Sequence, residues 1–176
     1  MAMSTMENLY RQYKGPVFRY LYRMSGDYHL AEELTQETFY RVLISLKGFR
    51  GESTLSTWLF RIAFNVYTVN LRDLRRRHNL PLDLDIPDDG RSGDPAHALE
   101  DAENHHLIKL ALQQLPAGYR TVIVLRAFEG LSFEEISVVL NKSPSTTRVA
   151  LFRARQKYRQ VYNQLAKGVS DLLITK

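Results

Sequence analysis

Apolar residues recur along most of the chain at intervals of three and four positions, a period typical of amphipathic α-helices. In the first part of the chain, the pattern predicts three helices, at Glu7–Met24, Tyr28–Lys47 and Ser56–Arg77. Gly15-Pro16 should kink or restart the first helix, and Ser53 or Ser56 should cap the third. In the last part, it predicts four helices, at His105–Gln114, Ala117–Phe128, Phe133–Leu140 and Pro144–Leu165. We therefore expect an all-α fold.

Between these parts, residues 79–104 interrupt the helical pattern with three prolines and two glycines. This segment has a formal charge of −7, whereas residues 1–78 carry +5 and residues 105–176 carry +7. We expect two small helical domains, residues 1–78 and 105–176, joined by a flexible acidic linker, residues 79–104. Alternating Leu82, Leu84 and Ile86 are equally compatible with a short strand or with an extended segment that binds a partner.

Composition narrows the possible functions. The 176 residues are 44% hydrophobic, enough for a buried core, and contain no cysteine, which excludes disulfides, thiolate metal sites and a cysteine nucleophile. The N-terminal sequence has no signal-peptide core, and the longest aliphatic run, Val122–Leu125, is far too short to span a membrane. We expect a soluble cytoplasmic protein. Its basic blocks favour polyanionic partners, although solvated basic surfaces explain the charge equally well.

Residues 131–159 have the layout of a helix-turn-helix, whose second helix enters the DNA major groove. Ser132 and Glu135 have capping-box spacing, Asn141 suits a left-handed turn, and Ser143-Pro144 suits a helix start. On the second helix, a buried stripe is predicted at Thr147, Leu151, Ala154, Tyr158, Tyr162 and Leu165. The opposite face would present Ser145, Arg148, Val149, Phe152, Gln156 and Arg159, with Arg153 at its margin. This face suits base and phosphate contacts, although an ordinary helix pair with a basic face would show the same pattern.

Two helices of the first part also have unusual outward faces. On residues 28–47, the outward side carries Glu33, Gln36, Glu37, Tyr40, Arg41 and Ile44, which resembles a protein-docking patch or scattered surface apolar residues. On residues 56–77, a polar ridge is formed by Arg61, Asn65, Thr68, Arg72 and Arg75. Phe60, Phe64 and Tyr67 lie beside it. Cations interleaved with aromatic rings suit single-stranded nucleic acid, but some of these rings are equally suited to the core.

Three stretches together resemble a bacterial RNA polymerase sigma factor of the extracytoplasmic-function group. They are "AEELTQETFYRVLISLKGF", "STLSTWLFRIAFNVYTVNLRDLRRR" and "LPAGYRTVIVLRAFEGLSFEEISVVLNKSPSTTRVALFRARQKYR". Their order matches the core-binding, promoter-melting and promoter-recognition segments of the family, over nearly the whole chain. The combination is far more specific than any one of these motifs.

The resemblance implies a role for each surface. Core polymerase, through its β′ clamp, would bind Glu33, Gln36, Glu37, Thr38, Tyr40, Arg41 and Ile44. The melted minus-ten strand, with one base flipped into a pocket, would contact Ser53, Thr54, Leu55, Trp58, Arg61, Asn65, Thr68 and Arg72. The minus-thirty-five duplex would contact Ser145, Thr146, Arg148, Val149, Phe152 and Arg153.

The resemblance also implies partners: the polymerase β flap, promoter DNA and an anti-sigma factor, with no cofactor, metal or small-molecule substrate. The acidic linker would thread the polymerase channel, as a nucleic-acid mimic or as a plain spacer. The chain departs from the family at Ser145 and Thr147, where glycine and valine are common, at Ala150, where a basic residue is common, and at Pro144.

Two rival functions are compatible with parts of the sequence. A DNA-binding regulator that works without polymerase would use the helix-turn-helix but would leave the first 78 residues without a role. A metal-dependent phosphodiesterase would use Asp83, Asp85, Asp88 and Asp89, whose carboxylates suit Mg²⁺. Those aspartates lie in a Pro/Gly-rich segment without histidine support, so a solvated linker explains them better.

Overall fold

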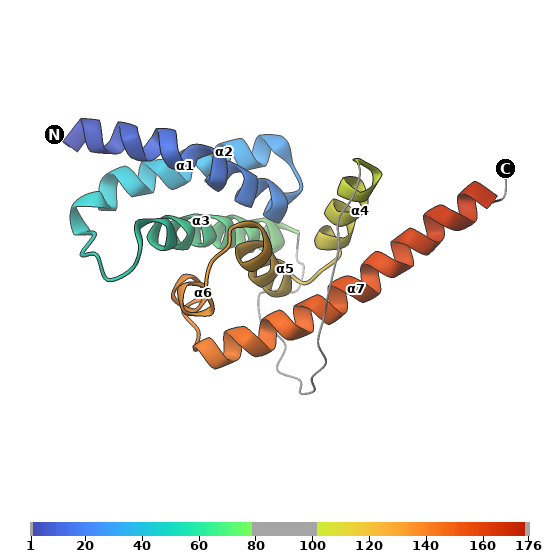
Figure 1. Ribbon diagram of the computed structural model, residues 1–176. Helices are drawn as coiled ribbons and strands as arrows, with labels where there is room; N and C mark the ends of the chain where they lie inside the picture. The colour runs from blue at the N-terminus through green and yellow to red at the C-terminus, as the bar shows by residue number, and fades with distance from the viewer. Residues whose placement is uncertain (1, 79–101, 175–176) are drawn as a thin grey trace.

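The computed structural model describes residues 2–78 and 102–174, and every regular element in these two ranges is helical (Figure 1). The first range holds α1 (Ala2–Ser25), α2 (Tyr28–Ser45), the 3₁₀ turn η1 (Leu46–Gly48) and α3 (Leu55–Arg77). The second holds α4 (Ala102–Gln113), α5 (Ala117–Ile123), the π-helical turn η2 (Val124–Phe128), α6 (Phe133–Leu140) and α7 (Pro144–Ile174). The all-α prediction is confirmed. Most of the predicted linker, with its possible strand and its four aspartates, lies outside the described residues.

Local sequence accounts for most of the helix boundaries. The Asp27 carboxylate caps α2 by accepting a hydrogen bond from the Leu30 N–H at 2.9 Å. Thr54, rather than Ser53 or Ser56, caps α3, since its Oγ1 accepts from the Thr57 N–H at 3.3 Å. The first helix continues through Pro16 without restarting. A proline removes one backbone hydrogen bond, and here buried side chains on the next two turns, such as Val17 and Leu21, offset that loss.

In the first half, α1 packs against both α2 and α3. The fully buried side chains of Tyr20, Leu21 and Met24 from α1 meet Val42 of α2 and Leu59 of α3. Tyr20 and Phe60 pack edge to face with ring centroids 5.5 Å apart. Phe60 and Tyr67 are therefore core residues, whereas Phe64 is half-buried at the edge of α3.

In the second half, α6, a turn and α7 form the predicted helix-turn-helix. The capping box is present: the Glu135 N–H donates to Ser132 Oγ at 3.1 Å, and the Ser132 N–H donates to Glu135 Oε2 at 2.8 Å. Asn141 is left-handed, with φ 52° and ψ 47°. Ser143 caps α7, since its Oγ accepts from the Thr146 N–H at 3.1 Å. Each local prediction for this motif is confirmed.

The buried stripe of α7 differs in part from the prediction. Thr147, Leu151 and Ala154 are buried as expected, and the Thr147 hydroxyl donates to the Ser143 carbonyl at 3.0 Å. Tyr158, Tyr162 and Leu165 are only half-buried, whereas Val161 is buried. Ala150 is also buried, so a basic residue at this position would lie in the core here rather than against phosphate. The helix runs nine residues past the predicted end and projects beyond α4 (Figure 1).

The two halves of the chain pack against each other. The α6 helix lies against α3, while α4, α5 and η2 contact α1. Buried residues from both halves, including Leu59 of α3 and Ile136 of α6, belong to one continuous hydrophobic cluster. The helix α4 begins at Ala102, three residues before its predicted start at His105. That residues 1–78 and 105–176 are separate domains stays a prediction.

Candidate nucleic-acid interface

On α2, exposed apolar side chains form a patch on the molecular surface. Tyr40 is 60% exposed, Ile44 is 64% exposed, and Leu43, which the sequence analysis did not single out, is 56% exposed. Arg41 donates to Glu37 Oε1 at 2.6 Å beside this patch. Glu33 and Gln36 are also exposed. These side chains are free to meet a partner protein.

Thr38 is an exception to the predicted docking set. Its side chain is fully buried, and its hydroxyl donates to the Leu34 carbonyl at 2.7 Å. It faces the core because it shares a helical side with Leu34 and Val42, which are both buried. A direct contact between Thr38 and a partner would therefore require α2 to repack.

The N-terminus of α3 and the loop before it carry a second set of candidate residues. Trp58 is half-buried and packs against Phe49, with ring centroids 5.1 Å apart. Thr54 is exposed at the cap, while Ser53 and Leu55 on either side of it are half-buried. Further along α3, the side chains of Arg61, Asn65 and Arg72 are exposed, so they form an accessible ridge. Polar donors thus follow α3 from its first turn towards its basic end.

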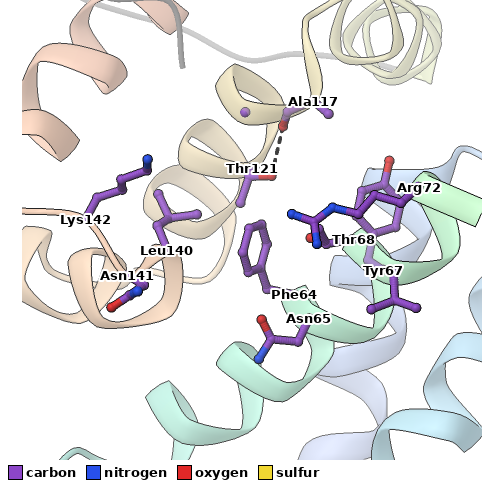
Figure 2. Close-up of a pocket in the computed structure, with 12 residues that line it drawn as sticks. Phe64, Asn65, Tyr67, Thr68, Arg72, Ala117, Thr121, Leu140, Asn141 and Lys142 are labelled. Carbon is purple, nitrogen blue, oxygen red and sulfur yellow. Dashed lines mark hydrogen bonds between the residues drawn. The ribbon is translucent and has the colours of Figure 1, made fainter. Parts of the chain in front are cut away.

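Thr68 does not belong to this accessible ridge. Only 8% of its surface is exposed, although the period of α3 places it beside Asn65 and Arg72. The second half of the chain covers it. Thr68, Asn65 and Arg72 line a pocket of about 380 Å³ together with Leu140 and Asn141 of the helix-turn-helix. Figure 2 shows the α3 side chains on one side of this pocket and those of the turn on the other.

The first turn of α3 is also covered, by a carboxylate from α6. Glu135 Oε1 accepts hydrogen bonds from Thr57 Oγ1 at 2.9 Å and from Thr54 Oγ1 at 3.1 Å. The pKa of Glu135 is lowered, mainly because the Ser132 N–H donates to the ionised carboxylate, with further help from these hydroxyls. Sequence reasoning assigned Glu135 only to the capping box. Its second role joins residues about 80 positions apart.

On α7, the N-terminal face presents Ser145, Thr146, Arg148 and Val149 to solvent. Arg148 is held by α6: its Nη2 lies 3.5 Å from Glu134 Oε1, and its guanidinium lies 5.3 Å from the centre of the Phe133 ring. Val149 is 46% exposed, which leaves an apolar contact available between polar neighbours. Gln156 and Arg159 continue this exposed face along the helix.

Two predicted members of the α7 face are less accessible. Phe152 is half-buried, and Arg153 is buried, with 9% of its surface exposed. The sequence analysis placed Arg153 at the margin of the exposed face. Whether a side chain at such a margin is buried depends on how the neighbouring helices pack. The helices α4, α5 and α6 all pack against α7. In this arrangement Arg153 is part of the packing rather than of the outer face.

No helix within residues 2–78 and 102–174 is long and apolar enough to cross a membrane. In those same ranges, histidine, aspartate and glutamate side chains form no cluster that could hold a metal ion. Asp83, Asp85, Asp88 and Asp89, the predicted metal ligands of the rival phosphodiesterase, lie outside the described residues.

Comparison with known families identifies both halves. Residues 9–77 match the family described as sigma-70 region 2, and residues 105–157 match the family described as sigma-70, region 4. The matches cover α2 and α3, most of α1, and the helix-turn-helix. They define the class of protein as a transcription initiation factor of the sigma-70 type.

Similar curated proteins are extracytoplasmic-function (ECF) sigma factors. The chain is 37% identical over 173 residues to SigE of Mycolicibacterium smegmatis, covering 97% of this chain and 65% of that one. It is 33% identical over 174 residues to SigM of Bacillus subtilis, covering 95% of this chain and 99% of that one. The chain belongs to the ECF group of RNA polymerase sigma factors.

Two solved structures share the fold. One is the sigma factor RpoE in complex with the anti-sigma factor NepR from Bartonella quintana, with a TM-score of 0.71, 20% identity and coverage of 89% of this chain and 96% of that one. The other is CnrH in complex with the cytosolic domain of CnrY, with a TM-score of 0.67, 22% identity and coverage of 92% and 90%. At these identities the comparison shows the fold alone.

Proposed function

We propose that this chain binds core RNA polymerase and selects promoters by contacting two DNA elements with two separate surfaces. In this proposal, the duplex minus-thirty-five element binds the N-terminal face of α7, and the melted minus-ten strand binds the first turn and the ridge of α3. The role involves no bond-making chemistry and takes place in the cytoplasm, where polymerase transcribes. The observation that best supports this proposal is that one sigma-type chain has both a helix-turn-helix with an exposed face on α7 and a basic helix, α3, flanked by aromatic side chains.

The α7 surface supports duplex recognition. A recognition helix contacts base edges through its first turns. In this chain, the first turns carry exposed hydroxyls and a guanidinium at Ser145, Thr146 and Arg148, beside exposed Val149. Arginine can donate two hydrogen bonds to guanine, and an apolar side chain can meet a thymine methyl group. The exposed arginines further along, such as Arg159, suit phosphates.

The α3 surface supports single-strand binding. Unpaired bases stack on aromatic side chains, at about 1–3 kcal/mol for each base, and phosphates meet cations and helix N-termini. Half-buried Trp58 lies in the first turn, and Arg61 and Arg72 are exposed along the ridge. Stacking of this size offsets part of the cost of unpairing, so holding the strand favours melting.

The α2 patch supports docking on the polymerase clamp. Tyr40, Leu43 and Ile44 are large apolar side chains that stay exposed in the described arrangement. Exposed apolar groups that cluster among charges are typical of protein interfaces. Mounting both DNA-binding surfaces on polymerase would raise the effective concentration of each for its own element. We further propose that an anti-sigma factor regulates the chain, in line with the solved complexes of similar fold.

Run-off transcription with core polymerase and a randomised promoter library tests this function. We expect the wild-type chain to direct initiation from a narrow set of sequences with two conserved blocks. A variant with Arg148→Ala should relax selection in the upstream block only, while Arg11→Ala, on an exposed part of α1, serves as the matched control. Transcripts that start without sequence preference, or failure to bind core polymerase, would refute the proposal. The rival regulator predicts tight duplex binding by the free chain instead.

A further inference from the structure

We propose that Phe133 and Glu134, on the first turn of α6, are positioning residues that make Arg148 selective for one base pair of the upstream duplex. This inference rests on the proposed function of α7 and deepens it. The two residues act on the DNA through Arg148. They hold its guanidinium where it can donate to a base edge, and they oppose its movement to a neighbouring phosphate.

Arg148 needs a restraint of this kind because its side chain is long and accessible. It lies in the second turn of α7, and 62% of the side chain is exposed. An unrestrained arginine has many rotamers, and the phosphates on either side of a groove attract the same positive charge as a guanine does. A phosphate contact carries no sequence information. Whether Arg148 contributes to specificity therefore depends on what limits its direction.

Two contacts from α6 limit that direction. Arg148 Nη2 lies 3.5 Å from Glu134 Oε1, and the guanidinium lies 5.3 Å from the centre of the Phe133 ring. Arginine stacks favourably on aromatic rings, and the carboxylate attracts the opposite charge. Each contact is weak on its own at an exposed position. Because both act on one guanidinium and come from adjacent residues of one helix, together they restrict it more than either would alone.

The contacting residues are themselves held in place. Phe133 is half-buried and packs against the hydrophobic core. Its ring also lies 5.0 Å from the guanidinium of Arg126, whose Nη1 donates to the carbonyl of buried Leu131 at 2.8 Å. The capping box at Ser132 fixes the same turn. A binding side chain keeps its direction only if the residues around it are fixed, and this turn of α6 meets that requirement.

The arrangement leaves Arg148 able to bind DNA. Among the described residues, the ion pair with Glu134 engages only Nη2, and 65% of the Glu134 side chain is exposed. An arginine has five N–H donors, so several remain for a guanine edge. The Glu134 carboxylate also repels phosphates, which disfavours any DNA position that brings the backbone towards α6. Both effects favour the base contact over the phosphate contact.

The test uses holoenzyme assembled from core polymerase and the full chain. Each holoenzyme is mixed with a duplex library that is randomised in the upstream block, and the bound DNA is sequenced. Arg148→Ala first identifies the position that Arg148 reads, as the position where base preference is lost. We expect Glu134→Gln and Phe133→Leu each to reduce the preference at that position about threefold or more, with the other positions within about twofold of the wild type.

A second quantity has the opposite sign. For Glu134→Gln, the share of unselected sequences in the bound DNA should rise about twofold, because the released guanidinium reaches phosphates and one repulsive charge is gone. In the double variant Arg148→Ala with Glu134→Gln, the preference at the Arg148 position should fall no further than in Arg148→Ala alone. The absence of a further loss would show that Glu134 acts through Arg148.

Glu7→Gln is the matched control for Glu134→Gln. It breaks another exposed ion pair, between Arg11 Nη2 and Glu7 Oε1 at 2.7 Å on α1, and it removes the same charge. It should leave every base preference within about twofold of the wild type. Phe133→Leu keeps both the net charge and an apolar side chain, so it removes the aromatic contact without a general charge effect.

Three results would decide against the proposals. If Glu134→Gln and Phe133→Leu both leave the preference at the Arg148 position unchanged, or weaken every position alike, the inference is overturned, since an equal loss indicates a role only in folding α6. If Arg148→Ala loses preference at no position, Arg148 reads no base and the inference is overturned as well. If the wild-type holoenzyme selects no upstream sequence, the proposed function itself fails, which is a separate result.

Discussion

Arg120 is predicted to be the side chain whose loss most weakens the packing of the second half. Its guanidinium donates five hydrogen bonds of 2.6–3.0 Å, four of them to backbone carbonyls, at Leu112, Gln113, Leu115 and Met24. The fifth goes to the Gln113 side chain. Arg120 thereby closes the corner between α4 and α5 and ties it to the end of α1. Burial lowers the pKa of Arg120, so these bonds compensate for a real desolvation cost.

The substitution Arg120→Met measures how much these hydrogen bonds contribute to the free energy of unfolding. Methionine keeps roughly the length of the side chain and removes every donor. A hydrogen bond to a charged group contributes about 1.5–3 kcal/mol, and a buried acceptor left without a donor costs about 1–3 kcal/mol. The contributions of the five hydrogen bonds cannot simply be summed. Water can enter a partly buried site and hydrogen-bond to the carbonyls, and the substitution also removes the cost of burying the charge. We expect a loss of about 3–5 kcal/mol in the free energy of unfolding. At about 2–4 °C for each kcal/mol in a chain of this size, the Tm should fall by about 6–20 °C.

Urea unfolding followed by circular dichroism at 222 nm, with calorimetry for the Tm, measures this loss. Arg11→Met is the matched control, because the Arg11 side chain is 75% exposed and forms an exposed ion pair with Glu7. The control should change stability by no more than about 1 kcal/mol. If Arg120→Met also stays within about 1 kcal/mol of the wild type, the hydrogen-bond reasoning is refuted.

Three further predictions concern the candidate interfaces. Replacing Tyr40 and Ile44 together by alanine should reduce affinity for core polymerase about tenfold or more, with unchanged helicity, and equal retention on immobilised polymerase would contradict this. Arg148→Ala should cost about 1–3 kcal/mol on the selected upstream duplex in filter binding, whereas an equal loss on every sequence would reassign Arg148 to a phosphate. The lowered pKa of Glu135 predicts stability that is present above pH 4.5 and is lost as the pH falls through the folded-state pKa. Glu135→Gln should therefore flatten the acid side of the Tm profile, and two parallel profiles would refute this.

Local interactions explain why much of the second half could be predicted. The capping box of Ser132 and Glu135, the left-handed Asn141 and the start of α7 after Ser143 each depend on residues within four positions. Such interactions can be read directly from spacing, so α6, the turn and the start of α7 are as predicted. The exposure of Tyr40 and Ile44 in the α2 patch was likewise predicted from the helical period, whereas that of Leu43 was not.

Periodicity was less reliable at the edges of each helical face. The period placed Thr68 on the polar ridge of α3, yet it is buried, and Thr38, which only the family resemblance assigned to the docking set, is buried as well. Arg153 is also buried. A helix exposes a given side only if no neighbour covers it, and α7 packs against α4, α5 and α6. The period of the sequence locates the centre of a face, whereas the neighbouring helices set its width.

The sequence by itself determined the helices, most of their boundaries and the centres of the three candidate surfaces, because these depend on contacts between residues a few positions apart. Only the tertiary structure decided how the two halves meet. The hydrogen bonds from Thr54 and Thr57 to Glu135, and the ion pair of Arg23 with Glu129, join residues about 80 to 106 positions apart. Glu135 shows the difference within one side chain: one oxygen accepts from the cap of its own helix, and the other closes the protein on itself.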